Sequence, residues 1–511
     1  MKTLLVVHKT HLDVGFTHLA ETVVDTYLDH FIPGAIERAR EMNAEAEAPR
    51  FVWTTGAWII WKALHHYEGA RLRALRDAIE RGWIAWHGLP FTFHTELLTP
   101  NLLRLAMKFS QWLDAEFGRE TVSAKMTDVP GHTIGLVPIL AEAGIRYLHL
   151  GVNPASKVPE VPEVFRWCCG EAEILVNYAR TYGSATLVEG CDTGLTFHHT
   201  NDNLGPPSRE SIDQEEAWLQ ARYRPEQVRS GTMDEFADAL EPLRHGLPVV
   251  EQEIGDSWIH GAASDPAKLA DYATLRRIVE ARADGLRDGS LPEISAWLEP
   301  LLLLPEHTWG LDVKAWFGDH KHYRPSELAE LRRSHRYRTL EQCWEEQRRY
   351  FHQARENLPP SWTEAEGVIQ ETRNTRRRSE PALGGESLDV SAGMTAGRWA
   401  IRFEPATGSL AQLFDTETGR DLCPAEGRLG WGIFHYQLYG REDYRSFFRD
   451  YIGPPPYPWW AREDFGKLGL PPELERGPSA TLHFGGGQVV RADETTTIRT
   501  ELQHRGEGIV L

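Results

Sequence analysis

A short apolar run near the start of the chain leads directly into a cluster of ionisable side chains. Residues 4–7 are uniformly apolar, and His8, His11 and Asp13 follow them. The run is too short for an amphipathic helix, so it predicts a buried parallel strand whose carboxyl end would face a ligand. In extended chain His11 and Asp13 point to the same side, as two ligands of one divalent cation must. A solvated strand end with one structural histidine is the alternative interpretation.

Composition limits the class of protein. The 511 residues, 41% of them hydrophobic, are enough for two or three domains with sizeable cores. A formal net charge of -19 argues against nucleic acid and anionic lipid as partners. No apolar stretch is long enough to span a bilayer, and the segment before His8 is shorter than a secretory signal, so we expect a cytoplasmic protein. The five cysteines form no Cys-x-x-Cys pattern, so nitrogen and oxygen atoms would hold any metal.

Helical and strand-like segments alternate after the first strand. This alternation predicts a mainly parallel sheet, either a barrel or a doubly wound layer. The expected helices cover residues 72–81, 102–117 and 136–143, and the expected strands cover residues 83–87, 123–127 and 146–151.

The pattern changes twice further along the chain. Residues 1–265 form the predicted α/β domain, and residues 266–370 predict successive helices with little strand signal. The polar, basic residues 371–385 predict a solvated linker. Short strand-like runs broken by turns then predict that a β-sandwich begins within residues 386–511, and we expect it to be incomplete at Leu511.

Further polar motifs accompany the first one. Asp128 directly follows the expected strand 123–127, and the turn at Pro130 would leave its carboxylate facing the cleft, although a helix N-cap is the alternative. Residues 197–206, which include Asn201 and Asp202, predict a rigid polar binding loop. His307 stands at the start of the helical region and is the best-placed candidate for a fourth ligand beside His11, Asp13 and Asp128.

Taken together, these motifs resemble glycoside hydrolase family 38, the metal-dependent α-mannosidases. More closely, the chain is similar to relatives grouped as domain of unknown function 5054. The resemblance matches His11-Leu12-Asp13 to the family's zinc-binding His-x-Asp pair, and Asp128 to its nucleophile, which also contacts the metal. It implies Asp202 as the general acid/base and His307 as the fourth ligand, with His260 as a competitor for that role.

The resemblance implies a (β/α)7-barrel-like domain, a helical bundle and the start of a β-sandwich. It further implies a retaining, metal-dependent exo-glycosidase that acts on α-mannosides, with one divalent ion, zinc by expectation, and a carbohydrate as its partner; homo-oligomerisation stays open. Expected substrate contacts are Asn201, Trp258, His260 and Trp309. Two alternatives remain: a metal-dependent amide or ester hydrolase with a metal-activated water, and an inactive carbohydrate-binding relative.

Overall fold

The computed structural model divides the chain into two compact units. Unit 1 comprises residues 1–370 and 451–469, and unit 2 comprises residues 371–450 and 470–511. The predicted boundary at residue 265 falls inside unit 1 and stays a prediction. The structure describes residues 1–154, 156–282, 289–316, 325–362, 367, 386–388, 393–404, 409–423, 431, 434–438, 441–452, 480–492 and 495–503. The predicted linker, residues 371–385, lies outside them.

Within the described residues of unit 1, ten strands in two sheets form the centre. One sheet has the order β3-β2-β1-β8 with β9 also paired to β1, and the other has the order β10-β6-β7-β5-β4. Every pairing in the two sheets is parallel except that of β6 with β7. The strands are β1 (Thr3–His11), β2 (Trp53–Gly56), β3 (Ile84–His87), β4 (Ser123–Asp128), β5 (Tyr147–Val152), β6 (Val164–Cys169), β7 (Ala172–Ala179), β8 (Thr193–Asp202), β9 (Gln227–Ser230) and β10 (Val249–Val250).

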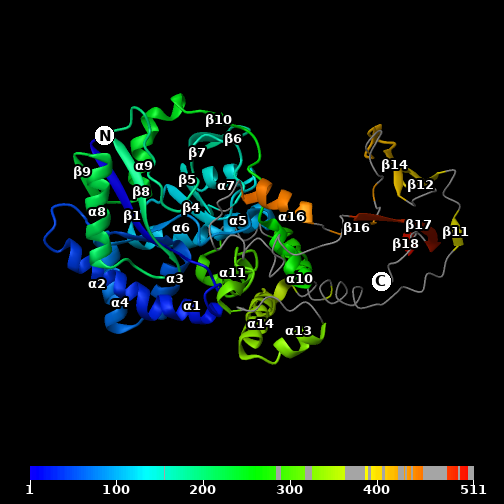
Figure 1. Ribbon diagram of the computed structural model, residues 1–511, viewed down its shortest axis with the longest axis horizontal. Helices are drawn as coiled ribbons and strands as arrows, with labels where there is room; N and C mark the ends of the chain where they lie inside the picture. The colour runs from blue at the N-terminus through cyan, green and yellow to red at the C-terminus, as the bar shows by residue number, and fades with distance from the viewer. Residues whose placement is uncertain are drawn as a thin grey trace. The chain divides into compact units, whose positions relative to one another are not determined.

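Helices alternate with these strands along the chain. In Figure 1, α2, α4 and α8 lie on the outside of the strands. The helices of this part are α1 (Ala20–Thr26), α2 (Ile32–Asn43), α3 (Ala57–His66), α4 (Gly69–Glu80), α5 (Pro100–Ala106), α6 (Lys108–Phe117), α7 (Leu136–Glu142), α8 (Arg209–Tyr223) and α9 (Met233–Leu240). The alternation confirms the α/β fold class expected from the sequence.

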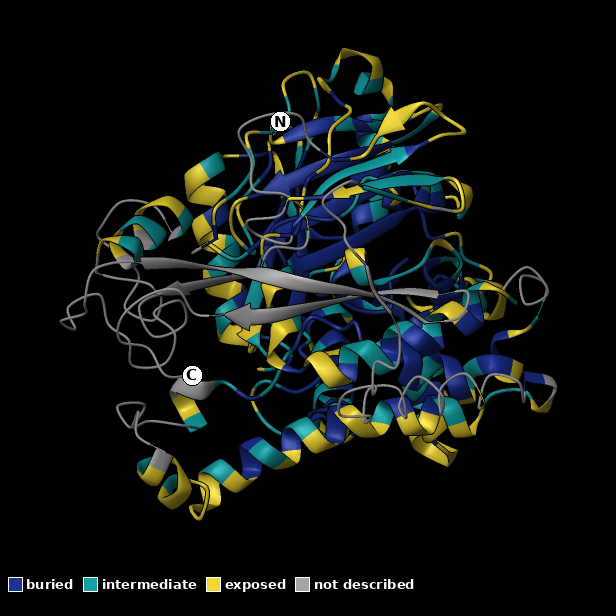
Figure 2. Ribbon diagram, turned by 90° about the vertical axis from the view of Figure 1, so that its right-hand side faces the viewer, coloured by how far each residue is buried: buried dark blue, intermediate teal, exposed yellow. Residues whose placement is uncertain are grey.

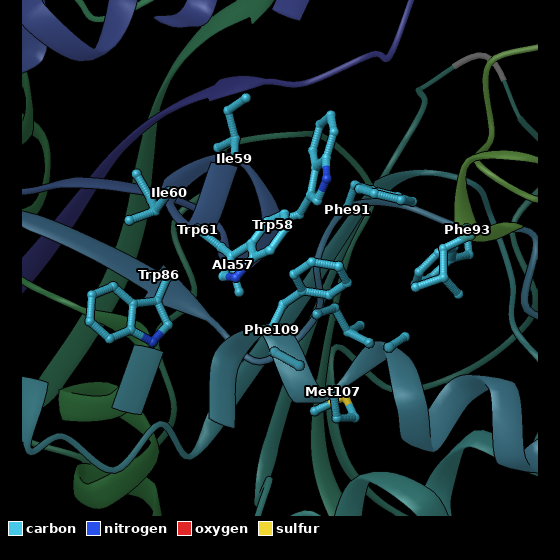
Figure 3. Packing of buried hydrophobic residues seen from close by; sticks show 14 of the residues in the cluster. Ala57, Trp58, Ile59, Ile60, Trp61, Trp86, Phe91, Phe93, Met107 and Phe109 are labelled. Atoms are coloured by element: carbon cyan, nitrogen blue, oxygen red, sulfur yellow. The ribbon is translucent and has the colours of Figure 1, made fainter. Parts of the chain in front are cut away.

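The main core lies between the strands and the surrounding helices. Figure 2 shows the strands of unit 1 buried and the outer faces of its helices exposed. Large aromatic side chains from α3, β3 and α6 meet there, among them Trp58, Trp61, Trp86 and Phe109 (Figure 3). Aromatic side chains bury the largest apolar areas, so this cluster contributes strongly to holding the helical layer on the sheet.

The helical segment that follows packs onto the same core. It contains α10 (Pro266–Glu280), α11 (Leu291–Leu303), α12 (Val313–Trp316), α13 (Pro325–Leu331) and α14 (His335–Glu356). Trp297 and Leu298 of α11 and Phe351 of α14 are buried in the main core cluster. Because these helices share a core with the strands, the loop between α11 and α12, which carries His307, is anchored to the α/β part. In the part of the chain that the structure describes, no helix has the length and apolarity to cross a membrane.

The described residues of unit 2 form antiparallel strands and the helix α16 (Arg441–Phe447). The order of one sheet is β12-β13-β14-β15, and that of the other is β11-β17-β16 with β18 paired to β17. The strands are β11 (Glu386–Leu388), β12 (Met394–Ala396), β13 (Trp399–Phe403), β14 (Leu410–Asp415), β15 (Arg420–Asp421), β16 (Phe434–Leu438), β17 (Ala480–Ala492) and β18 (Thr495–Gln503).

One local prediction is wrong. Residues 197–202 were predicted to belong to a polar loop, but they continue β8, which pairs with β1 along its length. Polar side chains on both faces of this strand hide the alternation that identifies a strand. His198 lies 3.2 Å from His8 through their Nδ1 atoms, and His199 packs its ring against Tyr182. The loop begins only at Asn203.

Candidate metal centre and active site

Four side chains from three separate regions meet at one end of the sheets. His11 ends β1, Asp13 follows two residues later, Asp128 ends β4, and His307 lies in the loop after α11. One donor atom from each lies within 4.8 Å of the other three. These are the four ligands expected from the sequence, and their role as ligands stays a prediction.

The spacing of the donor atoms fits a tetrahedral cation site. The Nε2 atoms of His11 and His307 are 3.0 Å apart. Asp13 Oδ1 lies 3.0 Å from His11 Nε2 and 3.1 Å from His307 Nε2. Asp128 Oδ2 lies 3.6 Å and 3.4 Å from the same two nitrogens. Ligands about 2.1 Å from a zinc ion stand about 3.4 Å apart in a tetrahedron, so these donors could hold such an ion.

Charge in the group favours a cation. Burial opposes protonation of His11, but the carboxylates of Asp13 and Asp128 outweigh it and raise its pKa to about 9. Burial also opposes protonation of His307, and Glu306, Asp128 and Asp13 raise its pKa well above the ordinary value. The two imidazoles thus take up protons in order to balance buried carboxylates. A divalent ion would replace those protons.

Glu306 orients the imidazole of His307. The Glu306 carboxylate is buried, and its Oε1 lies 2.7 Å from His307 Nδ1. Its Oε2 accepts a hydrogen bond of 3.0 Å from the Thr308 backbone N–H. With the proton on Nδ1, the Nε2 lone pair of a neutral His307 points toward the other ligands. A carboxylate behind a ligating histidine is a common device that fixes its tautomer and raises its basicity.

Asp128 is held in an unusual backbone conformation. Its φ is 81°, in the left-handed region that non-glycine residues rarely adopt. Burial would raise the pKa of its carboxyl group, but His11 and His307 outweigh burial and lower the pKa below the ordinary range. Its Oδ1 accepts hydrogen bonds from the Tyr182 hydroxyl and, at 3.2 Å, from Asn153 Nδ2. The carboxylate therefore stays ionised, with one oxygen toward the histidines and the other toward Tyr182 and Asn153.

Asp202 ends β8 beside the four-residue group, and its pKa is shifted in the opposite direction to that of Asp128. In the parallel pairing of β1 with β8, Asp202 is the partner of His11. Burial, then the negative charges of Asp13 and Asp128, raise the pKa of Asp202 to about 7. A carboxyl group that stays ionised beside one that keeps much of its proton up to near neutral pH is the combination that a nucleophile and a general acid require.

The four residues that we expect to contact the substrate differ in burial and in their hydrogen-bond partners. Trp309 is half-buried: its Nε1 donates to His94 Nε2 at 2.9 Å, and the Lys268 ammonium lies 5.1 Å from its ring centroid. His260 is exposed, and its Nδ1 lies 3.0 Å from the Ser257 backbone oxygen.

The structure does not bring His260 into the four-residue group. Trp258 is half-buried and precedes His260 by two residues. Asn201 is exposed next to Asp202, and its backbone oxygen accepts a 2.9 Å hydrogen bond from the Thr10 hydroxyl. All four residues remain predicted substrate contacts.

Three residues that contact Asp13 or Asp128 were not predicted to belong to the site. Asn203 joins the loop after β8 to the loop after β1, because its side chain bonds to both the N–H and the carbonyl of Asp13 at 3.1 Å. Tyr182 and Asn153, which contact Asp128, lie just beyond the ends of β7 and β5. Asp128 was predicted because a polar residue directly after a parallel strand faces the ligand. The same rule could have identified Asn153. Tyr182 carries no such signal, because β7 itself was not predicted.

Comparison with known proteins supports the resemblance stated above. The family described as domain of unknown function 5054 matches residues 262–504. His307 lies inside this range, and the other three metal-ligand candidates lie before it. No curated protein matches the sequence.

Solved structures extend the likeness to the whole chain. An α-mannosidase from Enterococcus faecalis V583 superimposes with a TM-score of 0.56 at 10% identity, over 97% of this chain and 66% of that one. A protein in glycosyl hydrolase family 38 from Enterococcus faecalis matches with a TM-score of 0.47 at 9% identity, over 98% of this chain and 73% of that one. The chain thus spans 66% of the length of the α-mannosidase. The fold of the chain resembles that of the α-mannosidase, and residues 262–504 match domain of unknown function 5054.

Proposed function

We propose that this protein is a retaining, metal-dependent exo-glycosidase that acts on α-mannosides. The observation that carries the proposal is that Asp128, whose pKa is lowered, and Asp202, whose pKa is raised, end neighbouring parts of the sheets beside the four-donor group, with Asp202 paired to His11. A glycosidase needs this division of roles between two carboxyl groups. The preference for α-mannosides rests on the likeness to the Enterococcus faecalis α-mannosidase, and therefore on the fold alone.

In the proposed reaction Asp128 attacks the anomeric carbon while Asp202 gives its proton to the departing glycosidic oxygen. A covalent glycosyl ester on Asp128 results. Asp202, now ionised, takes a proton from water, and this water cleaves the ester with net retention of configuration. The low pKa of Asp128 and the raised pKa of Asp202 supply the starting protonation states near neutral pH.

His11, Asp13, Asp128 and His307 would hold the divalent ion, for which zinc is the proposed identity. A bound ion would supply Lewis-acid contacts to two vicinal sugar hydroxyls. The protein supplies the rest of the geometry: Glu306 fixes the tautomer of His307, and Tyr182 and Asn153 orient the carboxylate of Asp128.

Metal analysis combined with an activity screen tests this function. The purified full chain is assayed for bound zinc and other divalent ions, and is screened against aryl α- and β-glycosides before and after chelation. We expect about one equivalent of metal, turnover of the aryl α-mannoside, loss of that turnover on chelation and recovery on adding zinc. Unchanged turnover after complete removal of the metal would contradict the proposal. Turnover of aryl esters or amides but of no glycoside would favour a hydrolase with a metal-activated water.

A further inference from the structure

An open hollow lies on the flank of β8, apart from the four-residue group. Its volume is about 600 Å³, within the range of about 300–1,000 Å³ that is typical of small-molecule sites. One side is lined by Glu215, Trp218 and Tyr223 of α8, and the other by residues 183–185 and by Thr196 of β8. Thr196 precedes Asp202 by six positions, which is about 20 Å along an extended strand, so the hollow is separate from the candidate active site.

Trp218 contributes a large, uncovered aromatic ring to this hollow. It is 54% exposed, although tryptophan is usually a highly buried residue. The ring of Tyr223 stands perpendicular to it, with the centroids 6.0 Å apart and an angle of 86° between the planes. Tyr223 in turn packs against the buried cluster around Leu219. The indole ring is therefore supported on one side and open to a ligand on another.

The opposite wall is made of small residues held close to β8. Residues 183–185 read Gly-Ser-Ala, and the Thr196 hydroxyl donates a 3.2 Å hydrogen bond to the backbone oxygen of Gly183. A Cβ atom on Gly183 would lie 2.8 Å from the carbonyl oxygen of Phe197, so a larger residue would push this wall away from the strand. Because the wall is close to β8 and its side chains are small, it leaves space in front of Trp218.

Glu215 lines the hollow with a carboxylate that has no partner. It precedes Trp218 by three positions on α8, so the two side chains are neighbours on the helix surface. The residue is partly buried, and burial raises the pKa of its carboxyl group. Among the residues that the structure describes, none forms a hydrogen bond or an ion pair with this carboxylate. A partly buried acceptor beside an exposed aromatic ring is suited to a ligand that carries hydroxyl groups.

We propose that this hollow is a secondary binding site for one unit of a neutral glycan. The C–H face of the sugar ring packs on the indole of Trp218, and its hydroxyl groups donate hydrogen bonds to the Glu215 carboxylate. Among the described residues that line the hollow, none is Lys, Arg or His, so a phosphorylated or acidic sugar would find no opposite charge. Binding there requires neither a metal nor hydrolysis, and the proposal therefore does not depend on the proposed function.

Two other ligands match the hollow less well. A quaternary ammonium group binds between open aromatic faces, but the guanidinium of Arg222 already lies 5.4 Å from the ring centroid of Tyr223. A second copy of the chain would cover a contiguous apolar patch. Among the described lining residues, however, Trp218 alone is a large apolar side chain that is exposed. Each alternative predicts a different response of Trp218 to added ligand.

Fluorine NMR of the full chain labelled with 5-fluorotryptophan tests the proposal. The resonance of Trp218 is the one lost in Trp218→Phe, and the control is Trp431, another exposed tryptophan, assigned from Trp431→Phe. The methyl α-glycosides of mannose, glucose and galactose are titrated separately. At least one of them should shift the Trp218 resonance in a saturable way without shifting that of Trp431. The proposal would be overturned if none of the three shifted Trp218, if only choline did so, or if concentrating the protein alone did so.

The variant Glu215→Gln tests the role of the carboxylate with the same readout. Its side chain keeps its size but loses its charge, so the sugar that shifts Trp218 should bind about 2–10-fold more weakly. The matched control is Glu210→Gln on the same helix, which alters a carboxylate bonded to Gln214 and should bind the sugar like the wild type. Equal affinity of Glu215→Gln and the wild type, or an equal loss in both variants, would overturn the proposal. No turnover is measured, so the result is independent of glycosidase activity.

Discussion

Replacing Asp202 by asparagine removes the proposed general acid while leaving the four cation ligands in place. A general acid contributes about 10²–10⁴-fold to the rate. The loss of kcat/KM on an aryl α-mannoside with a poor leaving group should therefore be about 10²–10⁴-fold, which is about 2.7–5.4 kcal/mol of transition-state stabilisation. A substrate whose leaving group departs without protonation should lose far less in its glycosylation step. The ratio between the two substrates measures the role of Asp202 as an acid.

The dependence of activity on pH provides a second test of Asp202. With a pKa of about 7, Asp202 is about nine-tenths protonated at pH 6 and about one-tenth at pH 8. Activity should fall as pH rises through that range, because the proton needed by the leaving group is lost. A bound cation lowers the pKa of a neighbouring carboxyl group, so the midpoint should lie at or below about 7. Asp202→Asn should lack this descending limb.

The matched control is Asp192→Asn, which changes an exposed aspartate that pairs with Lys2. Its activity and pH profile should equal those of the wild type, because exposed ion pairs contribute little. The reasoning would be refuted if Asp202→Asn lost the same factor on both classes of leaving group and kept the descending limb.

Other residues of the site make separate predictions. Glu306→Gln should weaken zinc binding about 10–100-fold, measured by competition with a chelator, because His307 loses its orienting carboxylate; unchanged affinity would contradict this role. Tyr182→Phe should lower kcat without removing the metal, because Asp128 loses a hydrogen bond; a drop in metal content equal to the drop in activity would argue against it. Zinc added to the metal-free protein at pH 7 should release protons from His11 and His307, because the pKa values of both imidazoles are raised. Calorimetry in buffers of different ionisation enthalpy should detect the released protons. A heat of binding independent of the buffer would be evidence against protonated ligands.

The part of the site that follows local rules could be predicted from the sequence. His11 and Asp13 follow a uniformly apolar run, and Asp128 follows a second strand; the carboxyl ends of parallel strands meet at one edge of a sheet. That rule alone is enough to expect the three side chains together. His307 belongs to another region of the chain; its position made it the best-placed candidate for a fourth ligand, and the resemblance to a known family added support.

The rest depends on pairings between distant segments. The strand character of β8 is hidden because His198 and His199 find polar partners, His8 and Tyr182, on the two faces of the strand. Those partners are 190 and 17 positions away in sequence and become visible only once the fold is known. The raised pKa of Asp202 has the same origin, because burial and two remote carboxylates produce it. No local pattern in the sequence records such an environment.

Chemical rescue of Asp128→Gly tests the central claim most directly. The variant, checked for bound metal, is incubated with an activated aryl α-mannoside with and without azide, and the products are analysed by NMR. We predict almost no turnover without azide, restored turnover with it, and a mannosyl azide of inverted configuration, because azide takes the place of the missing carboxylate. Absence of rescue in a variant that folds and retains its metal, or hydrolysis by that variant at the wild-type rate, would contradict the assignment of Asp128 as nucleophile.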